Sequence, residues 1–189
     1  MHSPLYRELH SEKNQENPKV HERFLDRLKK ILPANSEVII ITDSGFLSPW
    51  FKKVRSLGWD FVGRIPSNVH FRLIGKESSW CSVGELYKEA DAHPRKVGQV
   101  ELGKTRKEPL NCQLITYKKL KQGRKKYKTK GQPLYPDAEK RYRNMNKNPW
   151  ILATSLEGKK GLASIVKNIY SKRMQIEQNF RDDKNMRWG

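Results

Sequence analysis

The chain has 189 residues, with 39 Lys and Arg against 20 Asp and Glu, so its formal net charge is +19. This length suits one core with at most a small second unit, and the charge favours a polyanionic partner such as nucleic acid. The longest apolar run, residues 38–41, is too short to span a bilayer, and the N-terminus lacks a signal-peptide pattern. Cys81 and Cys112 have no companions at zinc spacing, which argues against a disulfide framework or a zinc site.

The first third of the chain alternates between strand and helix patterns. The expected elements are, in order, a weak edge strand at 5–10, a helix over 18–32, a strand at 37–42, a helix over 49–57 and a strand at 60–65. Pro18 is a typical first residue of an amphipathic helix. The β-branched run at 37–42 is typical of a strand buried on both faces of an α/β sheet. We therefore predict an α/β fold.

The pattern changes after Pro66. Short β-like segments are expected at 70–73, 97–102 and 112–117, with a short helix over 82–90. Residues 117–147 contain twelve Lys or Arg against two acidic residues, with tyrosines between them. This composition predicts a flexible basic arm that contacts phosphates, although such runs are as often solvated loops.

Residues 150–155 predict another buried strand, and a helix with a distinctive face follows it. Tyr170, Arg173, Glu177 and Lys184 lie at offsets that fall within a wedge of about 60° on a helix. A separate stripe is expected to face the core: Leu162, Ile165, Ile169, Ile176 and Phe180. The polar face could hold a metal ion and a phosphodiester together, whereas the alternative is an ordinary solvated face.

Asp43 directly follows the predicted strand at 37–42, where α/β folds place catalytic groups. As an alternative, Asp43 forms a turn that caps the next helix. Asp43 and Glu177 could converge on Mg²⁺ or Mn²⁺, which carboxylates prefer, while Arg173 and Lys184 hold phosphates.

The spacing Tyr170-x2-Arg173-x3-Glu177-x6-Lys184 resembles the Y-R-E-K signature of IS4-type DDE transposases. Residues 40–46, 61–64 and 149–155 also resemble strands of that family, in the same order. The resemblance implies a ribonuclease-H-like catalytic core with a β-rich insertion. It divides the chain into a partial core at 1–66, a basic insertion at 67–148, and a closing strand with the Glu-bearing helix at 149–189.

The resemblance also implies roles for individual residues. Asp43 and Glu177 would be catalytic ligands of Mg²⁺ or Mn²⁺. Side chains that would contact DNA at the transposon ends are Tyr170, Arg173, Lys184, Trp150 and Arg64. Trp150 would stack on a flipped base, although without the family it reads more simply as core. The family acts as a homodimer in the bacterial cytoplasm, with neither a membrane nor a small-molecule substrate.

The chain departs from the family at one catalytic position. The family uses three carboxylates, and no residue here fits the first Asp, because Asp26 lies within a predicted helix. We therefore expect an inactive fragment that lacks the first strands of the sheet and leaves an interior edge open. The alternatives are a non-catalytic basic nucleic-acid-binding protein and a ribonuclease-H-like nuclease with other substrates.

Overall fold

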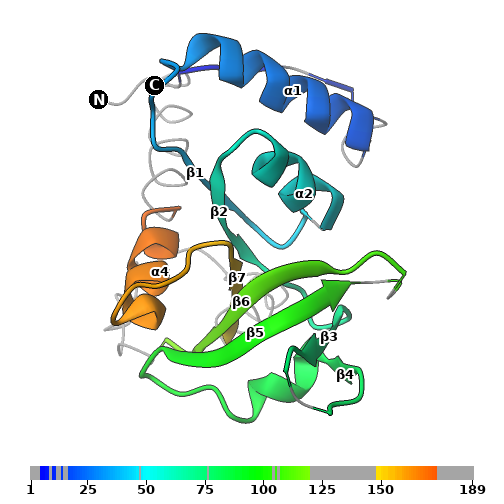
Figure 1. Ribbon diagram of the computed structural model, residues 1–189, viewed down its shortest axis with the longest axis vertical. Helices are drawn as coiled ribbons and strands as arrows, with labels where there is room; N and C mark the ends of the chain where they lie inside the picture. Colours follow the sequence, from blue (N-terminus) through cyan, green and yellow to red (C-terminus); the bar gives the residue numbers. More distant parts are fainter. Residues whose placement is uncertain are drawn as a thin grey trace, which may run out of the picture.

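The computed structural model describes residues 5–8, 10–11, 14, 17–46, 48–75, 77–103, 105, 107–119 and 148–173 (Figure 1). The elements follow in the order α1 (Pro18–Ile31), β1 (Ile39–Thr42), α2 (Ser48–Ser56), β2 (Asp60–Arg64), β3 (His70–Leu73), β4 (Cys81–Ser82), η2 (Val83–Tyr87), β5 (Arg95–Gly103), β6 (Leu110–Tyr117), β7 (Trp150–Thr154) and α4 (Leu162–Ser171). No helix in the described ranges is long and apolar enough to cross a membrane.

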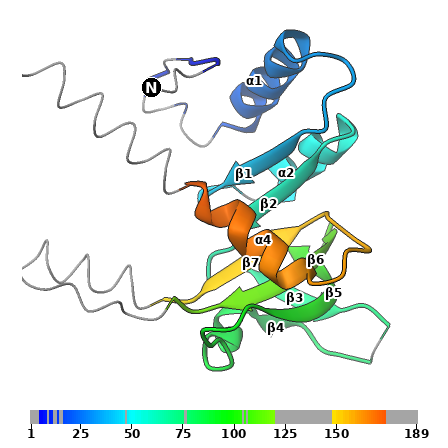
Figure 2. The ribbon, with the colours of Figure 1, turned by 90° about the vertical axis from the view of Figure 1, so that its left-hand side faces the viewer.

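The strands form one seven-stranded mixed sheet in the order β1-β2-β7-β6-β5-β3-β4. β1 and β2 are parallel, and every other neighbouring pair is antiparallel. β7 enters between β2 and β6, so it joins the opening strands to those of the expected insertion (Figure 2). The mixed α/β architecture is that of a ribonuclease-H-like core, as predicted, while the proposed division into three parts stays a prediction.

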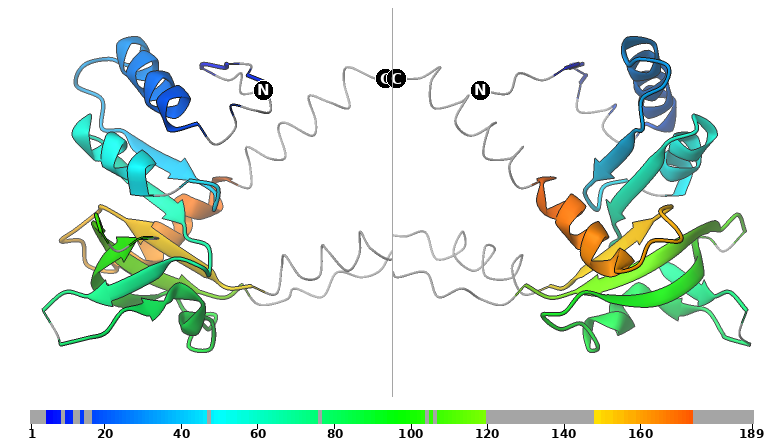
Figure 3. Two further views of the ribbon diagram at one scale, coloured as in Figure 1. Left: turned by 90° about the vertical axis from the view of Figure 1, so that its right-hand side faces the viewer. Right: turned by 60° about the vertical axis from the view of Figure 1, so that its left-hand side comes forward.

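Helices cover the two faces of this sheet, and successive residues of β2 point to different faces. Phe61 packs in one core cluster with Phe51 of α2 and Leu25 of α1. Val62 packs in the second cluster with Val166 of α4. α2 and α4 therefore lie on opposite sides of the sheet, which Figure 3 shows from two directions.

α1 begins as its sequence predicts. The Asn17 side chain caps the helix by accepting from the Lys19 N–H, and Pro18 stands in the first turn. Residues 5–8 and 10 are not in a strand, so the predicted edge strand is wrong at these positions. Tyr6 instead stacks on Phe24 of α1, with ring centroids 5.3 Å apart.

Glu8 ties the same segment to α1. Its carboxylate accepts a hydrogen bond from the Tyr6 hydroxyl and forms an ion pair with Arg27 at 2.9 Å. These contacts, the Tyr6 bond first, together with a bond from His10, lower the pKa of Glu8 to about 2. Side-chain contacts with α1, and not strand pairing, thus hold this segment.

The segments after Pro66 agree with their predictions. β3, β5 and β6 cover the three expected β-like stretches, and the predicted helix at 82–90 is a 3₁₀ helix, Val83–Tyr87. Ser82 and Glu85 form a reciprocal capping box at its start.

β1 differs from its prediction. Ile39 is 37% exposed, and Ile40 and Ile41 are half-buried, so the strand is not buried on both faces. The physical reason is its position, because β1 ends the sheet and within the described ranges pairs with β2 alone.

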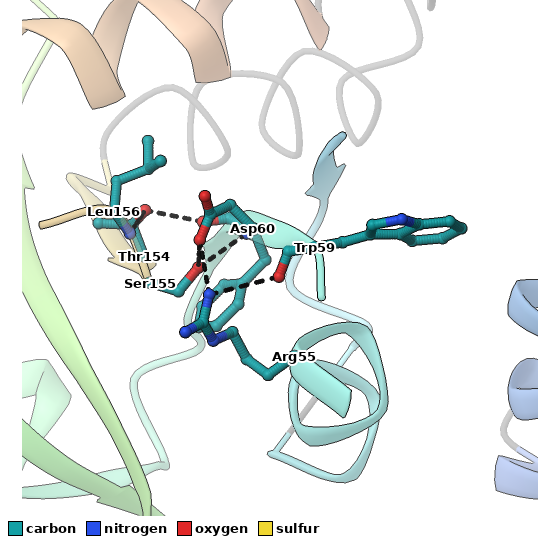
Figure 4. Close-up of polar contacts among 7 residues, drawn as sticks. Arg55, Trp59, Asp60, Thr154, Ser155 and Leu156 are labelled. Carbon is teal, nitrogen blue, oxygen red and sulfur yellow. Dashed lines mark hydrogen bonds and ion pairs between the residues drawn. The ribbon is translucent and has the colours of Figure 1, made fainter. Parts of the chain in front are cut away.

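Figure 4 shows how the start of β2 is fastened to the end of β7. The Ser155 hydroxyl donates to Asp60 at 2.7 Å and accepts from the Phe61 N–H at 3.0 Å. Arg55 of α2 donates to the same Asp60 carboxylate at 2.8 Å. The Thr154 hydroxyl donates to the Phe61 carbonyl at 2.7 Å. These bonds fix β2 relative to β7 and α2 at the end of the strands opposite to Asp43.

Candidate functional site

Asp43 follows β1 directly, and side chains from the end of α4 meet its carboxylate. The Arg173 guanidinium lies 2.7 Å from Oδ2, and the Tyr170 hydroxyl donates to Oδ1 at 3.3 Å. The Asp43 side chain remains 42% exposed, whereas that of Arg173 is 22% exposed. Two of the four residues on the predicted helix face therefore converge on the predicted catalytic Asp.

Tyr170 is more buried than the sequence suggested. It is only 2% exposed and packs with Leu162 and Val166 in the core cluster between α4 and the sheet. Of the predicted core stripe, Leu162 is buried and Ile169 packs against the cluster, whereas Ile165 is only half-buried. Ile176 and Phe180 lie outside the described residues. The helix is rotated so that the Tyr170 ring faces the core while its hydroxyl reaches Asp43.

The environment of Tyr170 holds it in the neutral form. Burial first, and then the Asp43 carboxylate, raise the pKa of Tyr170 to about 12. The guanidinium groups of Arg173 and Arg64 act in the opposite direction. A neutral phenol at this position can donate to Asp43 throughout the physiological pH range.

Arg64 belongs to the same site through the register of the sheet. Thr42 pairs with Gly63 across the parallel strands, so Asp43 and Arg64 follow at the same end of neighbouring strands. The charges that act on the Tyr170 hydroxyl are therefore one carboxylate, Asp43, and two guanidinium groups, Arg173 and Arg64. The excess of positive charge suits a phosphate ligand.

A row of three aromatic rings leads from Tyr170 to the end of β6. The Trp150 ring lies edge-on to Tyr170 with centroids 4.9 Å apart, and Tyr117 lies 5.4 Å beyond Trp150. The Lys167 ammonium stands 5.5 Å from the centroid of the Tyr117 ring. Trp150 is half-buried, so it is neither a fully enclosed core residue nor an open surface side chain.

Sequence reasoning placed Tyr117 in the basic arm and missed its contact with Trp150. The antiparallel pairing of β6 with β7, which aligns Tyr117 with Trp150, produces this contact. The sequence did contain a signal for this contact, because Tyr117 ends one predicted strand and Trp150 begins the next, on either side of the basic segment.

Glu177, Lys184 and residues 120–147 lie outside the described residues, so the roles predicted for them stay predictions. Within the described part of the chain, no group of three His, Cys, Asp or Glu side chains could hold a metal ion. Asp43 supplies a partly exposed carboxylate at this site, and carboxylate oxygen atoms suit Mg²⁺ or Mn²⁺.

The sequence was also compared with known proteins. A family model described as the transposase DDE domain matches residues 1–189. No curated protein matches the sequence at a significant level. Because the matched region spans the whole sequence, and the fold is the one that this family requires, the chain belongs to the transposase DDE-domain family.

Proposed function

We propose that this chain is the catalytic-core portion of an IS4-type transposase that binds DNA at transposon ends. The parent activity is Mg²⁺-dependent cleavage and strand transfer in cut-and-paste transposition. The observation that carries the proposal is the convergence of Arg173 and Tyr170 on Asp43, across 130 and 127 residues of chain. A solvated helix face gives no reason for this convergence.

Asp43 suits the metal that this activity requires. Its carboxylate is partly exposed and lies at the carboxyl end of a strand, where a divalent ion could reach it. We propose Asp43 and Glu177 as ligands. A bound Mg²⁺ would stabilise the developing charge on phosphate oxygens.

The cationic side chains have a separate role in the proposal. While Arg173 pairs with Asp43, its charge compensates the carboxylate. When another cation occupies Asp43, the guanidinium can turn to a DNA phosphate and donate two parallel hydrogen bonds. Arg64 and Lys184 are proposed to hold neighbouring phosphates, and Trp150 is proposed to stack on a flipped base.

We also infer that the chain by itself does not cleave DNA. The family uses three carboxylates, and Asp26 is the only Asp that precedes Asp43. Asp26 lies in α1, where it pairs with Lys53 of α2 at 2.7 Å and is 49% exposed. This pairing of Asp26 with Lys53 supports the inference that it is not the first catalytic carboxylate. Pairing of two DNA ends by a homodimer in the bacterial cytoplasm is proposed from the family alone.

A DNA-binding measurement tests the proposal. The full chain is titrated onto a fluorescent DNA duplex across a salt series, and R173A is compared with K30A. Lys30 is an exposed cation in the last turn of α1, so its replacement removes the same charge elsewhere. We expect R173A to bind DNA about tenfold more weakly, because Arg173 contacts the DNA backbone and the charge of Asp43 is then left uncompensated. The slope of log affinity against log salt concentration should decrease by about the contribution of one phosphate.

D43N serves as the matched second variant. It replaces the carboxylate that pairs with Arg173 by a neutral amide. Because one negative charge is removed from the site, D43N should bind DNA more tightly in the absence of metal. Equal, small losses for R173A and K30A, with no gain for D43N, would favour the non-catalytic basic binding protein, which draws on total charge alone.

A further inference from the structure

A cleft lies at the same end of the sheet as Asp43, on the face covered by α1 and α2. Its volume is about 400 Å³, within the range of small-ligand pockets. The first turns of α1 and α2 border it, together with the loops that follow β1 and β2. Ser44 and Phe46 come from the loop that Asp43 opens, and Asn68 comes from the loop just after Arg64.

Aromatic rings form one wall of this cleft. Phe46 and Trp50 have ring centroids 4.6 Å apart, and the His21 ring lies 5.2 Å from Phe46 and 5.6 Å from Trp50. Phe46 and His21 are half-buried, so parts of both rings remain accessible. Such a wall favours a flat ring that stacks, because aromatic pairs prefer offset or tilted contacts at these separations.

One polar group in this wall lacks a partner. Trp50 is 9% exposed, and its indole Nε1 is buried without a hydrogen-bond partner among the described residues. Buried donors are nearly always satisfied, so this N–H calls for an acceptor from outside the described residues. The enclosed N–H does not face the cleft, so Trp50 contributes its ring, and not this donor, to the cleft wall.

The rim indicates which part of a DNA strand fits. Lys53, a cation of the lining, is already paired with Asp26 at 2.7 Å, so the exposed carboxylate of Glu22 disfavours a phosphate inside the cleft. The exposed amide of Asn68 offers both a donor and an acceptor to the edge of a base. The Arg173 guanidinium pairs instead with Asp43, and the charge of Arg64 acts on Tyr170, which packs on the face covered by α4. Base and phosphate therefore have separate places at the same end of the sheet.

We propose that this cleft binds one unpaired base of a DNA strand whose backbone crosses the Asp43 site. The proposal rests on the proposed function, because it takes the DNA at Asp43 as given. It is distinct from the role proposed for Trp150, which packs on Tyr170 on the opposite face of the sheet.

The test compares two 15-nucleotide strands, oligo-dT and a fully abasic strand with the same phosphates, each titrated with the full chain. F46L removes the stacking ring and keeps the site apolar, whereas F46Y keeps the ring. We expect F46L to weaken oligo-dT binding about tenfold, to leave abasic binding unchanged, and F46Y to behave as the parent chain. W80L is the control, because Trp80 is a half-buried aromatic residue beside Arg72, outside the cleft.

The outcomes separate the two proposals. If F46L binds both strands as the parent does, or weakens both equally, no base occupies the cleft and this inference falls. If R173A and K30A bind both strands with the same affinity, the proposed function is contradicted, and with it this inference. Should F46L fail to fold by circular dichroism, H21L replaces it, with the same expectation for both strands.

Discussion

At the residue scale, Tyr170 shows how one side chain serves the core and the site together. Its ring fills the space between α4 and the sheet, while its hydroxyl ends at the Asp43 carboxylate. The same burial that stabilises the fold keeps the phenol neutral. Stability and the geometry of Asp43 are therefore linked through this residue, which has a measurable pH dependence.

Y170F should be less stable than the parent chain by about 1–2 kcal/mol at pH 8, because it loses a hydrogen bond to a carboxylate. The pKa of Tyr170 rises from 10 in the unfolded chain to about 12 in the folded chain. The stabilising contribution of the neutral hydroxyl is therefore complete below pH 10 and is lost as the pH rises through 12. The difference in the free energy of unfolding between the parent chain and Y170F should therefore decrease between pH 10 and pH 12.

Urea unfolding at several pH values between 8 and 12 measures this difference, with Y87F as the matched control. Tyr87 is a half-buried tyrosine of η2, away from Asp43. A difference between parent and Y170F that stays constant up to pH 12 would mean that Tyr170 does not ionise as its surroundings require.

At the scale of elements, the contact between α2 and β2 supports the pair of strands that precede Asp43 and carry Arg64. Phe51 of α2 is fully buried and stacks on Phe61 with centroids 4.5 Å apart. This packing needs Gly63, because a Cβ there would lie 2.3 Å from the end of the Phe51 ring. Gly63 also pairs with Thr42, next to Asp43.

G63A should destabilise the chain by about 1–3 kcal/mol, because the enclosed Phe51 ring must move out of a packed core. G45A is the control, since a Cβ at Gly45 would meet no atom within 4 Å in the described structure. Urea midpoints of the two variants provide the comparison. Equal midpoints for G63A and G45A would show that α2 moves away from β2 without cost.

Elements of this fold were predictable where the signal is local. The periodicity of α1, the β-branched run of β1 and the Gly after α2 each depend on neighbours in sequence, and these elements were predicted. Burial of β1 and the rotation of α4 were not, because Ile39 and Tyr170 take their environments from what packs across the sheet. Of the candidate site, Asp43 was predicted from its place after a strand, and Arg173 and Tyr170 from their spacing. The Trp50 cleft could not be predicted in this way, because it depends on three separate segments.

At the scale of the whole molecule, the chain carries a net charge of +19, whereas in its described part no group of three His, Cys, Asp or Glu side chains could hold a metal ion. DNA binding and catalysis therefore have different requirements. DNA binding depends on the summed charge, whereas catalysis depends on a particular set of metal ligands. The chain should bind DNA without breaking it.

Supercoiled plasmid incubated with the full chain and Mg²⁺ or Mn²⁺ should stay supercoiled, at the level seen with D43N. Gel mobility of the plasmid over time is the measurement. Nicking or linearisation by the parent chain, absent from D43N, would show that the carboxylates of this chain suffice for strand cleavage.

The span between Asp43 and Arg173 has a consequence for synthesis. The carboxylate and its guanidinium partner are 130 residues apart, and the helix that brings Arg173 to Asp43 follows β7, which lies between β2 and β6 in the sheet. At translation rates of about 5–20 residues per second, roughly 6 to 26 s separate the two residues on the ribosome. The first strands of the sheet thus emerge from the ribosome well before the segment that completes the site. Asp43 has no Arg173 to pair with until nearly all of the described chain has been made.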